Sequence, residues 1–469
     1  MNSKAEPPVE QPILLYQAAA KIYPKQARGR YARLRVLAML LLLGFYYLAP
    51  WIEIGGSPLV WFDLPHRRFH LFTLTLTPQD LIYLTWLLLI AALTLFFFTT
   101  LGGRLWCGYA CPQTVWTEAF LWMERITEGD RHARIKLDQA PWSARKLLRK
   151  GSKHLLWAGF GLYTGLTFVA YFVPARELFP AALTLQLAGW PLFWSLFYGF
   201  ATWGNAGFMR EQVCKYMCPY ARFQSAMFDK DTLIISYDQP RGEPRKSLAK
   251  KQGVAAGSCI DCSLCVQVCP TGIDIRKGLQ YDCIACAACV DACDAVMDSV
   301  QQPRGLIRYT SAHAEAGQRF RLLRPRVIGY GLIWLALCIG FVVALSLRTP
   351  LQFDVIRDRH SLYREVDEGV YENLYALKFA NEDSQPHRFR LSVAATDGQR
   401  YRVEPDSLLL AAGEAGALTV SVRNLAAEDG DEENAMRGIH SLNLVLQAED
   451  APGLRRERVA SFIAGAGHD

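Results

Sequence analysis

Residues 259–293 read CIDCSLCVQVCPTGIDIRKGLQYDCIACAACVDAC and contain eight of the 13 cysteines in the chain. The spacing Cys-x2-Cys-x2-Cys-x3-Cys occurs twice within this stretch. Three thiolates at positions i, i+3 and i+6 can wrap three corners of one iron–sulfur cubane in a tight loop, and the fourth reaches a neighbouring cluster. The stretch therefore predicts two 4Fe–4S clusters.

The spacing also indicates which cysteines share a cluster, because the fourth thiolate of each run serves the other cluster. The ligands expected for cluster one are Cys259, Cys262, Cys265 and Cys293, and those expected for cluster two are Cys283, Cys286, Cys289 and Cys269. Zinc sites usually use two paired Cys-x-x-Cys knuckles, and disulfides are rare in the cytoplasm, so both alternatives are disfavoured. We expect a ferredoxin-like α+β domain at about residues 250–300, in which Asp294 replaces the proline usual after the second run.

Four further cysteines form two Cys-x3-Cys-Pro motifs, WCGYACP at 106–112 and CKYMCPY at 214–220. Each follows a predicted membrane span, on the same membrane face, so the four thiols can converge. Positions i and i+4 lie on one side of a helix, and thiolates favour Cu(I), zinc and iron–sulfur centres. The candidate copper ligands are Cys107, Cys111, Cys214 and Cys218. The alternative is four reduced, buried thiols beside helix-breaking prolines.

The chain has 469 residues and a mean hydropathy of +0.07, which averages very different segments. Apolar runs with at most one charge, each near the roughly 20 residues that a span requires, predict five membrane helices. They occupy 34–51, 81–101, 155–173, 183–204 and 327–347. The run at 105–117 is too short to span and is expected at the membrane surface or as a re-entrant turn.

The distribution of charge predicts the topology. Segments 1–35, 102–154 and 205–326 carry 7, 10 and 17 Lys and Arg residues, whereas 55–80 and 174–182 carry 2 and 1. The positive-inside rule then places the N-terminus in the cytoplasm and the C-terminus outside. We interpret the basic loops as a consequence of this topology, because no nucleic-acid-binding motif accompanies them.

Residues 351–469 have a different character, with 13 basic and 21 acidic residues and no cysteine. Short stretches with apolar residues at alternate or nearly every position, at 388–393, 418–422 and 442–446, predict an all-β, Ig-like sandwich. The domain has no catalytic motif, so a structural or docking role is expected.

The chain is thus expected to be a multi-domain membrane protein. Its expected parts are a cytoplasmic segment at 1–33, a four-helix membrane region at 34–210, a cytoplasmic iron–sulfur segment at 211–326, a fifth membrane helix at 327–347 and the sandwich at 351–469. Cys338 lies alone within a span and is interpreted as core packing. No histidine lies within a span, which disfavours an intramembrane haem.

These features together resemble the CcoG/FixG (RdxA) family. The resemblance rests on WCGYACPQTVW at 106–116, CKYMCPYARFQ at 214–224, the double ferredoxin run and the strand-rich tail, and it extends from about residue 30 to the end. It implies an accessory protein for assembly of cbb-type cytochrome oxidase in the bacterial inner membrane. The family's proposed activity, reduction of Cu(II) to Cu(I), makes a cupric reductase the expected enzyme.

The resemblance also implies partners: a cytoplasmic electron donor, and oxidase subunits or copper-delivery proteins. Two alternatives are left open. The chain could be a quinol-linked polyferredoxin electron shuttle of a respiratory chain, or an assembly scaffold that acts through its Ig-like domain. A homo-oligomer is compatible with the sequence.

Overall fold

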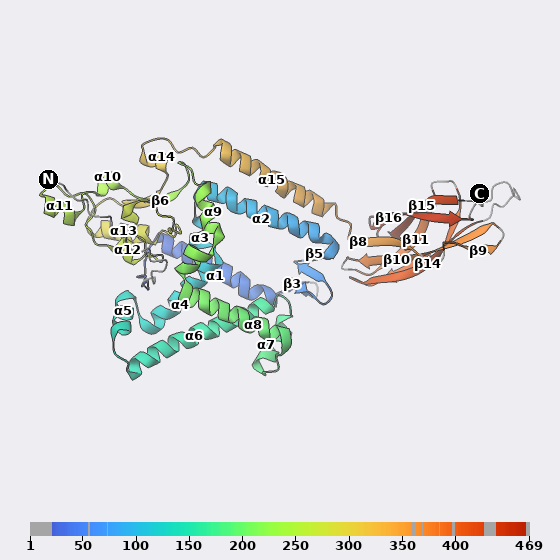
Figure 1. Cartoon of the computed structure of the whole chain (residues 1–469), viewed down its shortest axis with the longest axis horizontal. Helices are drawn as coiled ribbons and strands as arrows, with labels where there is room; N and C mark the ends of the chain where they lie inside the picture. Colours follow the sequence, from blue (N-terminus) through green and yellow to red (C-terminus); the bar gives the residue numbers. More distant parts are fainter. Residues whose placement is uncertain are drawn as a thin grey trace, which may run out of the picture. The chain divides into compact units, whose positions relative to one another are not determined.

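The computed structural model describes residues 21–54, 57–72, 74–358, 362–367, 369–383, 385–395, 399–425 and 438–465 (Figure 1). Residues 1–20 of the expected N-terminal segment, and 426–437 of the expected sandwich, lie outside the described residues. The chain divides into two compact units. The first comprises 1–52 and 88–335, and the second comprises 53–87 and 336–469.

The helices fall mainly in the first unit. They are α1 (Arg30–Leu48), α2 (Leu81–Gly102), α3 (Leu105–Tyr109), α4 (Pro112–Glu128), α5 (Arg131–Gln139), α6 (Ala144–Val169), α7 (Ala175–Leu183), α8 (Gly189–Thr202), α9 (Pro219–Met227), α10 (Gln239–Gly242), α11 (Lys246–Gln252), α12 (Leu264–Gln267), α13 (Ala288–Ser299), α14 (Ala312–Glu315) and α15 (Pro325–Ser346). The chain runs on from α8 as a π-helix, Trp203–Met209.

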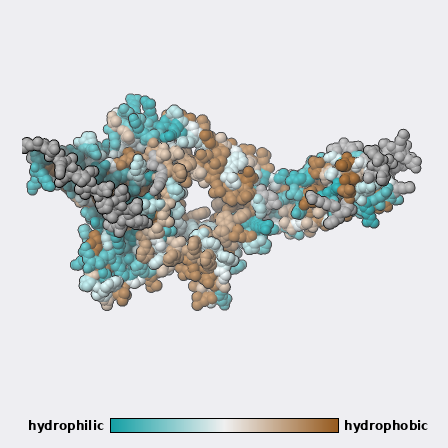
Figure 2. All heavy atoms as spheres, viewed as in Figure 1, coloured by the Kyte–Doolittle hydropathy of each residue, from teal (hydrophilic) through white to brown (hydrophobic). Residues whose placement is uncertain are grey.

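Among the described residues, three helices are long and apolar enough to cross a membrane. They are α1 with its 3-10 extension (Arg30–Trp51), α2 and α15, and they coincide with the first, second and fifth predicted spans. Many of their apolar side chains are exposed, including Leu41, Leu88 and Leu332, and they contribute to the hydrophobic surface in Figure 2. The protein is therefore a membrane protein, but these helices do not establish five spans.

The third and fourth predicted spans take other forms. Residues 155–169 of the third lie in α6, whose first turns are basic, and 170–173 follow the end of that helix. The fourth is interrupted between α7 and α8, where Leu185 and Gly189 have φ values of 58° and 63°. α8 alone has 14 residues, about 21 Å of helix against a hydrocarbon core of roughly 30 Å, and the π-helix Trp203–Met209 extends this helical run. α6 and α8 pack at glycines, because a Cβ on Gly165 would collide with the carbonyl oxygen of Ser195.

A buried charge network holds α4, α5, α6 and the π-helix together. Glu124 and Glu128 of α4 are both fully buried. The Glu124 carboxylate lies 2.8 Å from the Arg134 guanidinium and 3.0 Å from that of Arg210. Lys153 of α6 lies 3.0 Å from Glu128. The 105–125 segment is therefore fixed by ionic contacts as well as by the packing of α4.

The iron–sulfur region has the expected α+β character. Strands β6 (Ile234–Tyr237) and β7 (Ile307–Thr310) pair antiparallel. They pack with α13 around a core that includes Ile275 and Met297. Asp291 of α13 accepts hydrogen bonds from the backbone N–H groups of Tyr31 and Ala32, at 3.1 and 2.6 Å. It thereby caps α1, whose own N-cap residue offers no side chain.

The second unit contains the expected sandwich. One sheet has the order β12-β14-β10-β8, with β9 paired to β10, and the other has the order β13-β11-β15-β16. The strands are β8 (Leu351–Arg357), β9 (Arg364–Asp367), β10 (Val370–Asn381), β11 (His387–Ala395), β12 (Tyr401–Glu404), β13 (Ser407–Leu410), β14 (Ala415–Asn424), β15 (Gly438–Ala448) and β16 (Arg455–Ala464). Tyr375, Phe389, Leu444 and Phe462 fill its core.

The segment 55–80, expected only as a loop, contributes further strands. They are β2 (Ser57–Pro58), which pairs with β1 (Glu53–Ile54), and the three-stranded sheet of β3 (Val60–Asp63), β4 (Arg68–Leu71) and β5 (Leu74–Leu76). Arg348, just after α15, lies 2.6 Å from the Asp80 carboxylate and also pairs with Glu382 of the sandwich. This contact joins the ends of α2 and α15 to the first sheet of the sandwich.

The network predicts a strong effect of Glu124. Burial works to raise the pKa of its carboxyl, but Arg210, Arg134 and Lys153 together hold this pKa below its ordinary value. The stabilisation is thus present at neutral pH and is lost as the pH falls through the folded-state pKa. We expect Glu124→Ala to lower the free energy of unfolding by about 3–5 kcal/mol, measured by denaturation of the purified protein at pH 7, because it leaves buried cations unpaired.

Glu118→Ala is the matched control, because Glu118 lies on the same helix in a single, partly exposed ion pair with Arg125 at 3.0 Å. A change of at most about 1 kcal/mol is expected there. Equal effects of the two variants would contradict a special role for the buried network.

Candidate iron–sulfur and thiol centre

Two cysteine-lined cavities lie within the iron–sulfur region. The first is lined by Cys259, Cys262, Cys265 and Cys293. The second is lined by Cys269, Cys283, Cys286 and Cys289, and also by Cys265. These groupings match the two ligand sets that the spacing predicts. Cys265 borders both cavities, so the two sites are neighbours.

The backbone of the two cysteine runs is wound in the same way. Asp261 and Ser263 flank Cys262, the second cysteine of the first run, with φ values of 58° and 57°. Ala285 and Ala287 flank Cys286, the second cysteine of the second run, with φ values of 54° and 57°. Left-handed backbone at non-glycine residues is costly and is concentrated at functional sites. Its recurrence at equivalent positions indicates that both loops are shaped for the same ligand.

Burial makes a charged thiolate unfavourable at these positions. It raises the pKa of Cys265 to about 11 and the pKa values of Cys283 and Cys293 to about 12. The positive charge of a bound metal centre reverses this preference, because it stabilises the thiolate directly. The donor set, soft thiolates in apolar surroundings, therefore fits iron–sulfur clusters.

Within the described part of the chain, no three His, Cys, Asp or Glu side chains are grouped so that they could hold one metal ion. The four Cys-x3-Cys-Pro thiols therefore do not form a closed mononuclear site in this conformation.

Those four thiols, Cys107, Cys111, Cys214 and Cys218, are called the thiol quartet below. The two motifs fold alike. Cys107 lies in α3 and Cys214 in a π-helical turn (Val213–Met217), whereas Cys111 and Cys218 are the N-cap residues of α4 and α9. The expectation that each pair lies on one helix was therefore wrong. Proline at the first helical position starts a new helix and forces the preceding cysteine into extended backbone.

The thiol quartet is nevertheless brought together. Besides burial, a negative charge on Cys111 or Cys214 raises the pKa of Cys107, and one on Cys218 raises the pKa of Cys111, so these thiols are near neighbours. Burial raises the pKa of Cys107 to about 12 and that of Cys214 to about 11. The Cys107 thiol donates to Oε1 of Gln224 at 3.3 Å. Without a metal, Cys107 and Cys214 are therefore protonated at neutral pH.

The first motif lies directly against the loop of the second cavity. A Cβ on Gly108 would lie only 2.8 and 2.9 Å from the carbonyl oxygens of Ile284 and Ala285. Cys107 packs, as Cys289 does, against the hydrophobic cluster that contains Cys286. The absence of a side chain at position 108 therefore lets the thiol quartet approach the predicted cluster-two ligands.

Arg104 fastens this arrangement. Its guanidinium donates to the carbonyl oxygens of Tyr281, Cys283 (3.3 Å) and Ala221 (2.6 Å), so it joins the two thiol motifs to the cluster-two loop. Lys215 donates to the carbonyl oxygen of Thr271 at 3.2 Å. The sequence analysis did not identify Arg104, although a lone arginine between a span and a cysteine motif could have signalled its role.

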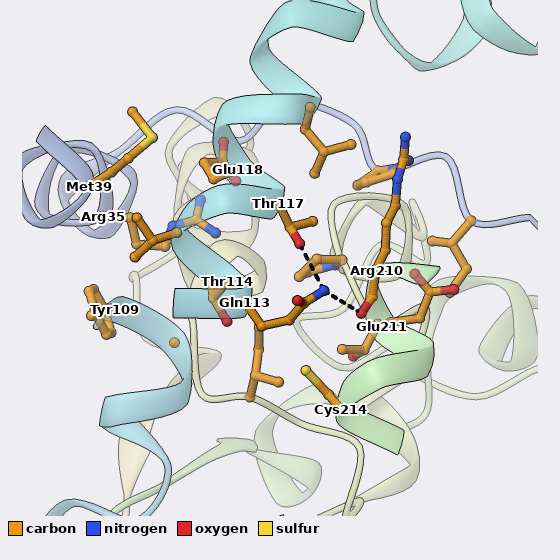
Figure 3. A pocket seen from close by; sticks show the side chains of 18 residues that line it. Arg35, Met39, Tyr109, Gln113, Thr114, Thr117, Glu118, Arg210, Glu211 and Cys214 are labelled. Carbon is orange, nitrogen blue, oxygen red and sulfur yellow. Dashed lines mark hydrogen bonds between the residues drawn. The ribbon is translucent and has the colours of Figure 1, made fainter. Parts of the chain in front are cut away.

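A small cavity of about 50 Å³ lies between Cys214 and the cluster-two loop (Figure 3). Gln113 extends along it and donates to the carbonyl oxygens of Asn205 and Arg210, at 2.9 and 3.1 Å. Arg35 and Glu118 line it from α1 and α4. The sequence analysis missed these polar residues too, because only the fold brings them beside the cysteines.

The fold and the site define a membrane iron–sulfur protein with an Ig-like C-terminal domain. Family models agree with this class: a 4Fe-4S dicluster domain matches residues 209–312, a 4Fe-4S binding domain matches 84–128, and the "IG-like fold at C-terminal of FixG" matches 341–465. The chain carries two 4Fe–4S clusters.

Curated relatives place the chain more narrowly. The nitrogen fixation protein FixG of Rhizobium meliloti (strain 1021) is 37% identical over 451 residues, covering 84% of this chain and 86% of the relative. Proteins RdxA and RdxB of Cereibacter sphaeroides are each 38% identical and cover 83% of this chain and 86% and 85% of their own lengths. The chain therefore belongs to the FixG/RdxA family, which confirms the resemblance.

Among solved structures, the crystal structure of a FixG-related protein from Vibrio parahaemolyticus is similar to part of the chain. It is 22% identical, covers 24% of this chain and 96% of its own, and has a TM-score of 0.20.

The expected ligand assignment, in which the fourth cysteine of each run binds the other cluster, generates a prediction. Cys269 stands in the first run but lines the second cavity, with Cys283. We expect Cys269→Ala to remove cluster two, about half of the bound iron, and to leave the EPR spectrum of Cys283→Ala rather than that of Cys259→Ala. Cys338→Ala is the control and should keep all the iron. A Cys269→Ala spectrum that matches Cys259→Ala would refute this assignment.

Proposed function

We propose that this chain is an iron–sulfur oxidoreductase that reduces Cu(II) to Cu(I) during assembly of a cbb-type cytochrome oxidase. Copper, the substrate, is taken to bind at the thiol quartet. The observation that carries this proposal is the contact of Gly108 with Ile284 and Ala285, which sets the first thiol motif against the loop of the second cavity.

The proposal assigns Cys259, Cys262, Cys265 and Cys293 to cluster one and Cys283, Cys286, Cys289 and Cys269 to cluster two. When bound, the clusters supply one-electron transfer. Cys262 is exposed, whereas Cys286 is buried. We therefore infer that a cytoplasmic donor docks beside Cys262, and that electrons leave on the Cys286 side, toward the thiol quartet.

The chemistry of the thiol quartet suits this substrate. Thiolates are soft ligands that hold Cu(I) better than harder, oxygen-preferring ions, so one-electron reduction moves copper toward the state that the site prefers. Because burial keeps Cys107 and Cys214 protonated, metal binding there must release protons, and copper affinity should rise with pH. Closure of the thiol quartet around the ion requires a rearrangement, since no three of these side chains are grouped for a single ion now.

We further propose the five-span topology, with the N-terminus cytoplasmic and the sandwich periplasmic in a bacterial inner membrane. α6 and α8 then complete the membrane region that α1, α2 and α15 begin. Segment 211–326 is the cytoplasmic iron–sulfur part, and 351–469 is a surface that oxidase subunits or copper-delivery proteins can contact. Deletion of 351–469 that leaves oxidase assembly intact would refute this docking role.

The copper role is tested by replacing all four cysteines of the thiol quartet with alanine. We expect loss of at least about 90% of Cu(II) reduction by pre-reduced, anaerobically purified protein, because the substrate then has no thiolate ligands. Iron content and cluster EPR spectra should be unchanged. Reduction is measured with a Cu(I)-specific chelator dye.

Cys338→Ala controls for the loss of a thiol elsewhere and should reduce Cu(II) normally. Gly108→Val tests the electron route separately: the added side chain should push the two loops apart, keep copper binding and slow reduction. Full activity of the quadruple variant would refute the copper site, and cluster reduction by a quinol analogue would favour the electron-shuttle alternative.

A further inference from the structure

A second, much larger cavity lies beside the cluster-two loop. It has a volume of about 970 Å³, at the upper end of the range of roughly 300–1,000 Å³ for ligand sites. Its walls come from residues 24–29, the first turns of α1 and one face of α4. Pro270 and Ala288 also line it, next in sequence to Cys269 and Cys289.

The walls of this cavity are amphipathic. Leu37 and Leu40 of α1, and Trp122 of α4, form an apolar part. All three side chains are exposed, and α1 is one of the helices that can cross a membrane. An acyl chain can therefore lie along α1 without any cost for displacing water from polar groups.

The other part of the cavity is strongly basic. Lys25, Arg28, Arg33, Arg35 and Arg125 line it, against the single carboxylate of Glu118, which already pairs with Arg125 at 3.0 Å. Within the residues that the structure describes, Arg28 and Arg33 have no side-chain hydrogen bond or ion pair, and the buried Nε of Arg35 has no partner. Arg35 has the Glu118 and Asp291 carboxylates nearby, whereas the exposed side chains of Arg28 and Arg33 are available to an anion.

We propose that this cavity binds an anionic phospholipid of the cytoplasmic leaflet. Arg28, Arg33 and Arg35 hold the phosphodiester, and an acyl chain lies against Leu37, Leu40 and Trp122. A neutral quinol would fit the apolar part but would leave the cations unpaired, so the charge favours the lipid. The side assigned to the lipid rests on the proposed topology.

A lipid in this cavity would limit the access of solvent to cluster two. Pro270 and Ala288 separate the cavity from the proposed ligands Cys269 and Cys289. An occupied cavity excludes water from this side of the ligand loop, and solvent access is one of the quantities that sets a cluster's stability and potential. Delipidated protein should therefore lose cluster two sooner than cluster one.

The test uses the full-length, cluster-loaded protein in detergent, titrated with phosphatidylglycerol or phosphatidylcholine and analysed by native mass spectrometry. We expect preferential retention of one phosphatidylglycerol. Arg28→Gln/Arg33→Gln should weaken this binding by roughly tenfold or more. Arg30→Gln, a neighbouring exposed arginine that does not line the cavity, should bind like the unaltered protein.

A second readout does not depend on the double variant folding. Brominated phosphatidylglycerol should quench Trp122 fluorescence in the unaltered protein, and Trp122→Phe should remove that component. Equal retention of both lipids, equal binding by the Arg28/Arg33 and Arg30 variants, displacement by millimolar inorganic phosphate, or displacement by a quinol analogue at stoichiometric concentration would each overturn the proposal. Copper reduction, measured in the same samples, fails or survives independently of these outcomes.

Discussion

A cysteine thiol that is buried among other thiols loses its proton readily only when a metal binds the sulfur and stabilises the thiolate. This constraint governs the first unit, because burial holds the pKa values of Cys265, Cys283 and Cys293 at about 11 to 12. The apolar core around Ile275 and Met297 is small, and much of the remaining interior is lined by cysteines. The clusters thus supply part of the free energy that a larger hydrophobic core would otherwise provide.

Close backbone packing brings the thiol quartet beside the cysteine loop of the second cavity. Gly108 allows the first thiol motif to touch the backbone of Ile284 and Ala285, and Arg104 joins that motif to both neighbouring loops. These contacts use backbone carbonyl groups, so their geometry depends little on side-chain rotamers. A short connection of this kind suits electron transfer between the two kinds of site.

The sequence predicted those features that depend on local spacing. The repeated cysteine run predicted which thiols line each cavity, and alternation at 388–393, 418–422 and 442–446 predicted strands β11, β14 and β15. Both depend on residues a few positions apart. Long apolar runs in the sequence also predicted membrane spans. Apolar length alone did not predict the structure at 183–204, where Leu185 and Gly189 turn the backbone out of a helix.

Features that depend on distant residues could not be predicted in this way. The partners of Glu124 lie in α5, α6 and the π-helix, and Arg35 reaches the cysteine loops only through the packing of α1. Each thiol pair was expected on one helix, yet Pro112 and Pro219 start new helices and leave Cys111 and Cys218 as N-caps. The rule for residues before proline would have predicted that break.

The cap that Asp291 provides for α1 connects the first membrane helix with the cysteine-bearing helix α13, which lies far from it in the sequence. Its carboxylate closes the first turn of a membrane helix, and it lies on α13 between Cys289 and Cys293. With Cys289 and Cys293 as proposed cluster ligands, cluster binding and the capping of α1, some 260 residues away in the chain, should stabilise each other. Loss of the clusters is therefore expected to weaken the cap on the first turn of this membrane helix.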